Sequence, residues 1–238
     1  MKLTILMYHK IDELTPDVKH PGNYVAPGEF VRQIDAMLAW GYRTITFEEW
    51  LAHRDGRRIP LPEKPLIITF DDGYTCFARN AWPVLRERGM GATMFVVAGQ
   101  IGGTNVWDRG EKQEPLLNAS GILALHSQGV TIGSHGMTHQ ALARIPPERA
   151  LDELTRSRHA LGELLSRAPD VVAYPYSNQS LAVRRLAFRA GYRAAVRGKG
   201  RLNSRWTDAL GLRRVKVEHG WTVEDLEQKL RRERRRLF

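Results

Sequence analysis

One stretch, residues 66–74 (LIITFDDGY), limits most strongly what this chain can fold into. Its apolar, partly β-branched beginning predicts a buried strand, with Pro65 at the strand entrance, where a missing N–H is tolerated. Asp71 and Asp72 follow at the carboxyl end, where parallel α/β proteins gather ligands and catalytic groups. Neighbouring strand residues point to opposite sides, but Gly73 permits a turn that lets both carboxylates face one pocket. The alternative is a solvated Asp-Asp-Gly turn.

Strand-like and helix-like segments alternate along the whole chain. Apolar runs predict strands at residues 2–8, 43–47, 66–70, 92–98, 130–133, 171–174, 192–196 and 212–217. Amphipathic runs predict helices following residue 29, from residue 47, at 77–88, at 115–128, from Pro146 onwards, at 181–190 and at 222–235. Residues 12–27, with three prolines, are expected to be a loop. The alternation, without any low-complexity linker, predicts a single α/β domain over residues 1–238, a barrel of seven or eight parallel units.

Composition supports a globular chain and indicates the compartment in which it works. The chain has 238 residues, 42% of them hydrophobic, so it can bury a substantial core. Its one cysteine, Cys76, excludes an intramolecular disulfide framework; it is either a packing residue or a nucleophile. The apolar run at residues 3–8 is strand-length rather than a signal peptide, and no stretch approaches the roughly 20 residues of a membrane-spanning helix. We therefore expect a cytoplasmic protein with a cytoplasmic substrate.

The chain is basic, with a formal net charge of +10 and a pI near 10.0. Such a balance favours an anionic partner, but no zinc-finger, RRM or helix-turn-helix pattern accompanies it, so nucleic acid is not expected. The excess gathers in a basic C-terminal helix and tail at residues 222–238. Either this is a solvated helix end, or it makes weak contact with the anionic inner face of a membrane. The side chains expected to project into solvent are Arg231, Arg232, Arg234, Arg235 and Arg236.

A second polar stretch follows the strand expected at residues 130–133. His135 and His139 form a His-x-x-x-His pair, a spacing that can bring two imidazoles to one metal ion. One carboxylate from Asp71 and Asp72 would complete a set of two histidines and one carboxylate, with open positions for water and substrate. Taken alone, the pair is equally compatible with two surface histidines. The two strand ends together predict a metal site.

These stretches resemble the motifs of the polysaccharide deacetylases, the NodB-homology carbohydrate esterases of family 4. Residues 69–74 (TFDDGY) match the T-F-D-D-G motif, and residues 134–139 (SHGMTH) match S-H-[ST]-x-x-H, with Gly136 in place of the hydroxyl residue. Residues 173–177 (AYPYS) resemble the third motif, which ends P-[YF]-G. The resemblance extends from about residue 3 to residue 191 and points to the biofilm-polysaccharide N-deacetylase branch. It implies a distorted, incomplete (β/α) barrel and metal-dependent removal of an N-acetyl group from an amino sugar.

The resemblance also implies roles for individual residues. Asp72, His135 and His139 would bind one divalent metal ion, most often zinc in the family, with cobalt, nickel or manganese as alternatives. Asp71 would be the general base that takes a proton from the attacking water. The backbone N–H of Tyr176 would stabilise the oxyanion. The two adjacent aspartates would thus act as one ligand and one base.

The chain departs from the family pattern at several positions. Ala173 stands where many members carry the arginine that orients the base, so another group must hold Asp71 or its pKa is less tuned. Several members of the biofilm branch also lack that arginine. Ser177 replaces the glycine of the third motif, and the fourth motif, D-x-x-D-W, is not recognisable. The late L-x-x-H motif, which supplies a catalytic acid, has only His219 as a candidate, and His9 competes with it as proton donor or active-site wall.

Two other classes of function remain open. One is a deacylase of another amide, such as a deformylase acting on a lipid-linked sugar, which would use the same motifs. The other is a basic binding module without catalysis, although all four of its motif carboxylates and imidazoles are intact. For the favoured N-deacetylase, the substrate classes are a polysaccharide, a lipid-linked sugar and a glycoside precursor. The sequence does not identify the sugar, the acyl group, the native metal or the oligomeric state.

Overall fold

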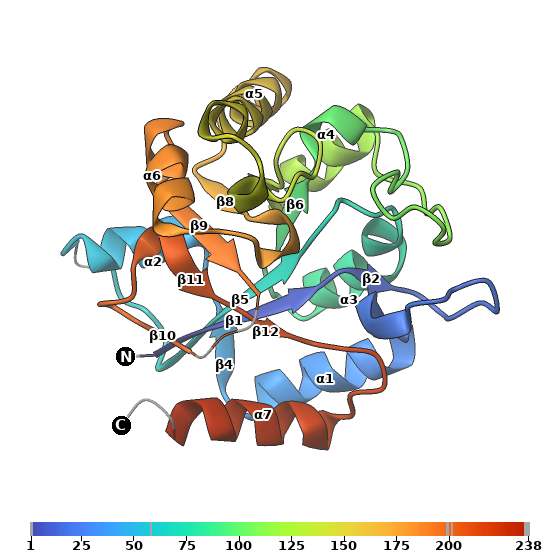
Figure 1. Ribbon diagram of the computed structural model, residues 1–238. Helices are drawn as coiled ribbons and strands as arrows, with labels where there is room; N and C mark the ends of the chain where they lie inside the picture. Colours follow the sequence, from blue (N-terminus) through green and yellow to red (C-terminus); the bar gives the residue numbers. More distant parts are fainter. Residues whose placement is uncertain (1, 58, 199, 201, 236–238) are drawn as a thin grey trace.

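The computed structural model describes residues 2–57, 59–198, 200 and 202–235, and it shows a parallel sheet rolled into a nearly closed barrel surrounded by helices (Figure 1). The barrel strands follow in the order β1 (Lys2–Tyr8), β5 (Lys64–Phe70), β6 (Thr93–Val96), β7 (Thr131–Ser134), β8 (Val171–Ala173), β9 (Ala194–Arg197) and β11 (Leu212–Arg213). All neighbouring pairs in this order are parallel. The predicted distorted (β/α) barrel of seven or eight units is therefore confirmed.

The barrel closes through one short, interrupted segment near the C-terminus. β11 pairs with β9, and β12 (Val215–Lys216), which begins two residues after β11 ends, pairs with β1 on the other side of the gap. Arg214 lies between the two strands, and its backbone N–H donates to the carbonyl of Arg197 at 3.0 Å. We call residues 212–216 the closing segment. It brings a residue distant in sequence into the middle of the barrel.

Short strands lie outside this ring. β4 (Tyr42–Thr44) extends the sheet beside β5, and β10 (Asn203–Ser204) pairs antiparallel with β1. β2 (Lys10–Ile11) and β3 (Tyr24–Val25) form a separate parallel pair, so the stretch expected to be a loop at residues 12–27 ends in a strand and a helix start. Such two-residue strands carry no periodic signal, which is why the sequence does not reveal them.

The helices cover the outside of the barrel. They are α1 (Pro27–Ala39), α2 (Phe47–Arg54), α3 (Trp82–Glu87), α4 (Ala119–Ser127), α5 (Pro147–Leu165), α6 (Leu181–Arg189) and α7 (Val223–Arg235). α2 begins at a capping box in which Thr46 and Glu49 satisfy each other's backbone N–H groups, as the sequence predicts. α7 lies along α1, so the C-terminal helix packs beside the first helix of the chain (Figure 1). No helix in the described part of the chain is long and apolar enough to cross a bilayer.

Two predicted helices differ from those observed. Residues 77–88 are a π-helical turn (Phe77–Ala81) followed by the short α3, because Pro83 has no N–H to continue the regular hydrogen-bond ladder. α4 begins at Ala119 rather than near residue 115. There the Asn118 side chain accepts the N–H of Gly121 at 2.8 Å and caps the helix.

Strand alternation divides the apolar side chains between two cores. Ile5 and Ile67 point into the barrel, where they pack with Phe95 and Val196. The ring of Phe95 lies only 2.6 Å from where a Cβ at position 133 would stand, so this barrel layer requires Gly133. Alternate residues of the same strands face the helices instead, in the largest cluster. Apolar side chains fill the barrel interior, so the polar side chains lie together at the carboxyl ends of the strands.

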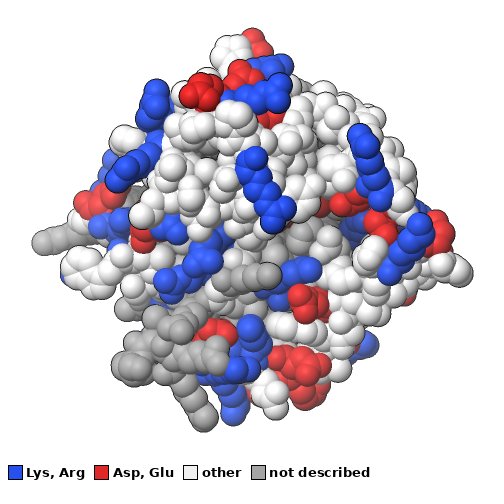
Figure 2. Space-filling model, in the orientation of Figure 1, with Lys and Arg blue, Asp and Glu red and all other residues white. Residues whose placement is uncertain are grey.

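The basic C-terminal helix is only partly solvated. Leu226 and Leu230 are buried, as predicted. Arg231 and Arg232 are exposed, but Arg234 is half-buried, with its guanidinium over the ring of Tyr42, so the prediction that it projects freely into solvent is wrong. The side chain of Arg235 and the whole of Arg236 lie outside the described residues. On the face seen in Figure 2, the described Lys and Arg side chains are interspersed with Asp and Glu rather than forming one patch.

Candidate metal centre

The two carboxylates at the end of β5 reach one pocket because the backbone turns sharply between them. Asp71 continues the strand, its N–H donating to the carbonyl of Tyr8 at 3.0 Å, and it points into the barrel as Thr69 does. Asp72 and Gly73 then adopt positive φ angles of 74° and 85°. The glycine adopts this conformation without strain, whereas the aspartate does not. The turn that was predicted to let both carboxylates face one pocket is present.

Backbone strain is concentrated around this pocket. Five non-glycine residues in the described chain have positive φ, and four of them, Asp72, His139, Tyr176 and Ser177, line the pocket. The fifth, Ser166, ends α5. Such conformations typically cost about 1–3 kcal/mol each, and they persist only where surrounding structure holds them. Their location therefore marks the pocket as a functional site on grounds independent of any motif.

Asp72, His135 and His139 form a buried cluster whose ligand atoms all lie within 4.8 Å of one another. Asp72 Oδ1 has no hydrogen-bond partner in the described structure, yet the Nε2 atoms of His135 and His139 lie 3.4 and 3.3 Å from it. Ligands bound tetrahedrally at zinc distances are separated by about 3.3 Å. The unpaired buried oxygen and the two facing nitrogens thus fit a single divalent ion.

Neighbouring groups orient both imidazoles. The Nδ1 of His135 lies 2.7 Å from the carbonyl oxygen of Ala173, which can only accept, so Nδ1 carries the proton and Nε2 is free for a metal. The ring of His139 stacks on Trp107, with centroids 4.3 Å apart, and meets the ring of Tyr176 edge-on at 4.6 Å. The hydrogen bond leaves His135 only Nε2 for the cluster, and the ring contacts hold His139 with its Nε2 toward Asp72.

Asp71 is held by an arginine that the sequence analysis missed. The guanidinium of Arg214 donates to both carboxylate oxygens of Asp71, at 2.6 Å each, and to Thr69 Oγ1 at 3.0 Å. Burial opposes ionisation of Asp71, but Arg214 and His135 outweigh it and keep the pKa of this carboxyl below its usual range. Arg214 therefore holds the base, in place of the arginine that many family members carry at the position of Ala173. The stretch at residues 212–217 (LRRVKV) carries three cationic residues, and nothing in the sequence distinguishes Arg214 among them.

The ionisation of the cluster follows from the same burial and pairing. Burial opposes the charge of Asp72, yet the two imidazoles that face it hold its pKa well below the usual range. Burial opposes the charge of His135 in turn, but Asp71 and Asp72 raise its pKa. The coupling means that both carboxylates are ionised at neutral pH. The ionised Asp72 and the two imidazoles form a donor set that suits a divalent cation.

The cluster lines one wall of a cavity of about 400 Å³ at the carboxyl ends of the strands. Four aromatic side chains, Trp107, Tyr174, Tyr176 and Trp221, also line it, and Tyr176 is 58% exposed. Further charged side chains in the lining are Asp108, Lys216, Glu218 and Lys229. The size and mixed character suit an organic ligand with polar groups.

The two candidate proton donors are placed differently. His9, at the end of β1, lines the cavity, and its buried Nδ1 has no hydrogen-bond partner in the described structure. Burial lowers the pKa of His9 to about 4, although Asp72 and Asp71 oppose this, so the imidazole is neutral at neutral pH. His219 is exposed in the turn after β12 and is not among the described residues that line the cavity. The remaining expected site residues, including Tyr176, are brought together.

Cys76 lies apart from this chemistry. It is buried in a small cluster with Tyr74 and Leu116, and burial raises the pKa of its thiol far above neutrality. A protonated, enclosed thiol is a poor nucleophile. The structure supports the packing role for this cysteine.

Fold and site together define a class of protein: a distorted α/β barrel with an Asp-His-His cluster and a second, arginine-bound carboxylate at the carboxyl ends of its strands. The family model for polysaccharide deacetylase matches residues 58–195, more than half of the chain and including the cluster. The chain belongs to the polysaccharide deacetylase family.

Individual relatives agree with this assignment. The chain is 29% identical over 223 residues to YxkH of Bacillus subtilis (strain 168), whose name assigns it to the polysaccharide deacetylases; the match covers 92% of this chain and 72% of YxkH. It is 25% identical over 190 residues to the poly-beta-1,6-N-acetyl-D-glucosamine N-deacetylase of Staphylococcus epidermidis, covering 72% of this chain but only 63% of that protein.

Solved structures show the same fold. The deacetylase PplD of Streptococcus pyogenes, in complex with acetate, superimposes with a TM-score of 0.83 at 24% identity, covering 97% of this chain and 98% of PplD. IcaB of Ammonifex degensii superimposes with a TM-score of 0.80 at 24% identity, covering 96% of this chain and 97% of IcaB. The chain therefore shares the fold of these proteins over almost its whole length.

Proposed function

We propose that this chain is a metal-dependent N-deacetylase that hydrolyses the N-acetyl group of an amino-sugar substrate. One observation carries the proposal: a buried, unpaired Asp72 oxygen faces two imidazole nitrogens, directly beside a second carboxylate that an arginine keeps ionised. A metal ligand set and a separate base are the two parts that water-dependent amide cleavage requires. Membership of the polysaccharide deacetylase family supports the same reaction.

Asp72, His135 and His139 would hold the ion, most naturally zinc given two nitrogen ligands and one oxygen ligand. When bound, a divalent ion lowers the pKa of a water molecule and polarises the amide carbonyl. Asp71 accepts the proton of the attacking water. Arg214 keeps this carboxylate ionised and fixes the direction of both oxygens, so the base is ready at neutral pH.

Two further groups would complete the reaction. The backbone N–H of Tyr176, on a strained turn at the cavity wall, would stabilise the negative charge that develops on the carbonyl oxygen. Breaking the C–N bond then transfers a proton to the amine and leaves acetate. Because His9 is neutral, it can donate a proton only after receiving one, and the proton taken up by Asp71 is the source. We assign this relay to His9 rather than to His219, which does not line the cavity.

The cavity favours a sugar as the carrier of the acetyl group. Trp107, Tyr176 and Trp221 line the cavity beside polar and charged side chains, a combination that suits the apolar faces and hydroxyl groups of a pyranose ring. The staphylococcal relative is named for a β-1,6-linked N-acetylglucosamine polymer. An oligomer of this kind is therefore the first substrate to test, followed by lipid-linked N-acetylglucosamine and soluble glycosides.

The deciding experiment measures acid release by the zinc-loaded protein across this panel, with N-formyl analogues included. We expect acetate from at least one N-acetylated sugar, loss of turnover after chelation, and recovery when zinc is added back. Formate release alone would favour the deacylase of another amide. No acid from any substrate, with zinc bound stoichiometrically, would contradict the proposed hydrolase.

A further inference from the structure

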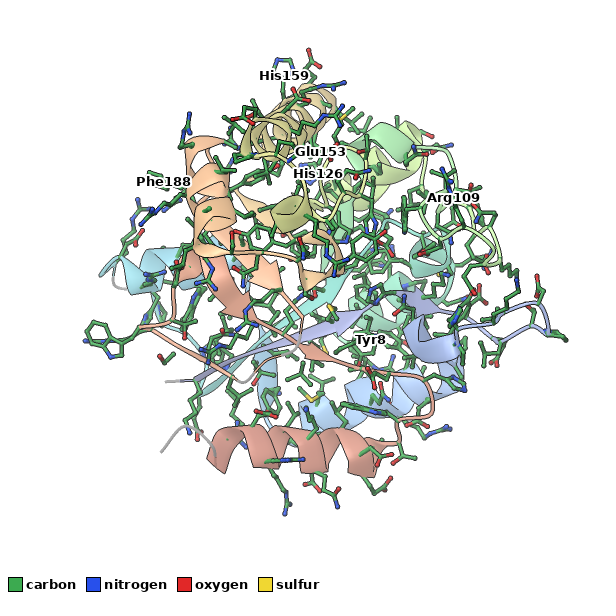
Figure 3. The ribbon with its side chains drawn as sticks, viewed as in Figure 1. Tyr8, Arg109, His126, Glu153, His159 and Phe188 are labelled. Carbon is green, nitrogen blue, oxygen red and sulfur yellow. The ribbon has the colours of Figure 1, made fainter. Side chains whose placement is uncertain are left out.

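The turn of three residues that links the two histidine ligands, residues 136–138, is held by one carboxylate from a neighbouring helix. Glu153 of α5 accepts the backbone N–H of Met137 at 2.9 Å and that of Thr138 at 2.8 Å, both at Oε2. Its other oxygen, Oε1, accepts the hydroxyl of Thr138. Figure 3 shows Glu153 on the side of α5 turned toward the barrel, whereas His159 of the same helix points outward. The carboxylate thus binds the turn between His135 and His139.

The opposite side of this turn is held by backbone groups. The carbonyls of Gly136 and Met137 accept the N–H groups of Ala98 and Gly99, at 3.0 and 2.8 Å. A Cβ on Gly99 would come within 2.6 Å of the Met137 oxygen, so this approach requires glycine. The turn therefore lies between a short 3₁₀ segment after β6 and a carboxylate from α5.

Gly136, the first residue of the turn, lies beside the carboxylate. This residue has a φ of 80°, and a Cβ there would stand 3.4 Å from Glu153 Oε2. A second contact from α5 supports the same segment: Ser134 Oγ donates to Ser157 Oγ at 2.9 Å and accepts the N–H of Gly136 at 3.2 Å. Because Glu153 and Ser157 lie four residues apart, they form one face of α5, and that face contacts both ends of the turn.

Glu153 has none of the usual partners of a buried charge. It is only 9% exposed, and no lysine, arginine or histidine forms an ion pair with it among the described residues. Three donors from residues 137 and 138 satisfy its oxygens instead. This buried carboxylate does more than stabilise the fold, because the turn that it holds ends in His139, whose own φ is 60°.

We propose that Glu153 is a positioning residue that sets the separation and direction of His135 and His139 for the metal ion. The inference rests on the proposed function only in that the cluster binds a divalent ion. Groups behind metal ligands typically change metal affinity by 10–100-fold when they are removed. What matters at this position is the reach of the side chain, since one oxygen must accept two backbone N–H groups at once.

The test compares two substitutions that separate length from charge. Glu153→Gln keeps the length, and its amide oxygen can accept both N–H groups while its NH₂ donates to the Thr138 hydroxyl. Glu153→Asp keeps the charge but is one methylene shorter and cannot reach all three donors. Glu163→Asp is the matched control, because this glutamate lies on the same helix with its side chain 71% exposed.

Zinc affinity is measured on the full-length apoproteins by competition with a chromogenic chelator, with circular dichroism to confirm that each is folded. We expect Glu153→Asp to bind zinc about 10–100-fold more weakly than wild type. Glu153→Gln should stay within about threefold, and Glu163→Asp should be unchanged. Wild-type affinity in Glu153→Asp would overturn the proposal, and so would a weaker affinity in Glu153→Gln than in Glu153→Asp, which would indicate an electrostatic role. Failure of wild type to release acetate, with its zinc affinity intact, would count against the proposed function alone.

Discussion

Replacing Arg214 by methionine would remove the guanidinium that binds both oxygens of Asp71 while keeping most of the buried volume. The pair is almost fully buried, with side-chain exposures of 1% and 4%. Breaking a buried ion pair from one side typically costs about 3–5 kcal/mol, because the remaining charge is left uncompensated. For a domain of this length, each kcal/mol corresponds to about 2–4 °C in Tm, so we expect Tm to fall by about 6–20 °C.

The pH dependence of this loss provides a sharper test. In wild type the pKa of Asp71 is lowered in the folded state, so this group stabilises the fold above its unfolded pKa and the contribution is lost on acidification. Without Arg214, burial becomes the dominant effect and raises the pKa of Asp71 above the unfolded value. A raised pKa stabilises below the unfolded pKa and is lost as pH rises. The difference in Tm between variant and wild type should therefore widen from about pH 4 to about pH 8.

The pH dependence of activity should change for the same reason. Asp71 must be ionised to act as base, so the acid limb of kcat/KM should move to higher pH by about 1–3 units in Arg214→Met. The control is Arg193→Met, which breaks a half-exposed pair with Asp55 at 3.1 Å and should cost about 0–1 kcal/mol. Adding Asp71→Asn to Arg214→Met should restore much of the stability, because no buried charge remains. A variant with wild-type Tm and an unmoved acid limb would refute the reasoning.

The remaining predictions concern the aspartates and the basic helix. Asp71→Asn should keep zinc, measured by metal analysis, and lose about 10²–10⁴-fold in turnover, whereas Asp72→Asn should lose zinc affinity as well; the inverse pattern would reverse the two roles. The C-terminal helix should give weak co-sedimentation with anionic phosphatidylglycerol vesicles at low salt, at about 1 kcal/mol per exposed arginine. Changing Arg231 and Arg232 to glutamine should reduce the pelleted fraction, and equal pelleting would exclude a membrane role for these residues.

The parts of the structure that the sequence predicts are those with a local signal. The run before Asp71 has the apolar, β-branched composition of a buried strand, and parallel strands bring their carboxyl ends to one edge. The aspartates and the His-x-x-x-His pair could therefore be placed in one pocket from the sequence alone. Thr46 and Glu49 likewise mark the start of α2 through a pattern of only four residues.

The parts that could not be predicted depend on contacts between distant segments. Arg214 lies 143 residues from Asp71, and only the pairing of β12 with β1 shows that the two meet. Glu153 looks like an ordinary polar position of an amphipathic helix, because two of its three partners are backbone N–H groups, which leave no trace in sequence. In both cases the functional side chain is known only once the packing of the barrel is known.

Arg214 also connects barrel closure to the state of the base. It occupies the single residue between β11 and β12, the point at which hydrogen bonding passes from β9 to β1. This position is held in two ways, by Arg197 through its backbone and by Asp71 through its side chain. The ion pair therefore joins the closing segment to the carboxyl end of β5. Its loss would loosen the closing segment and raise the pKa of the base together. That is why the stability and pH profile of Arg214→Met should change as a pair, and a variant that changed one without the other would separate closure of the barrel from control of Asp71.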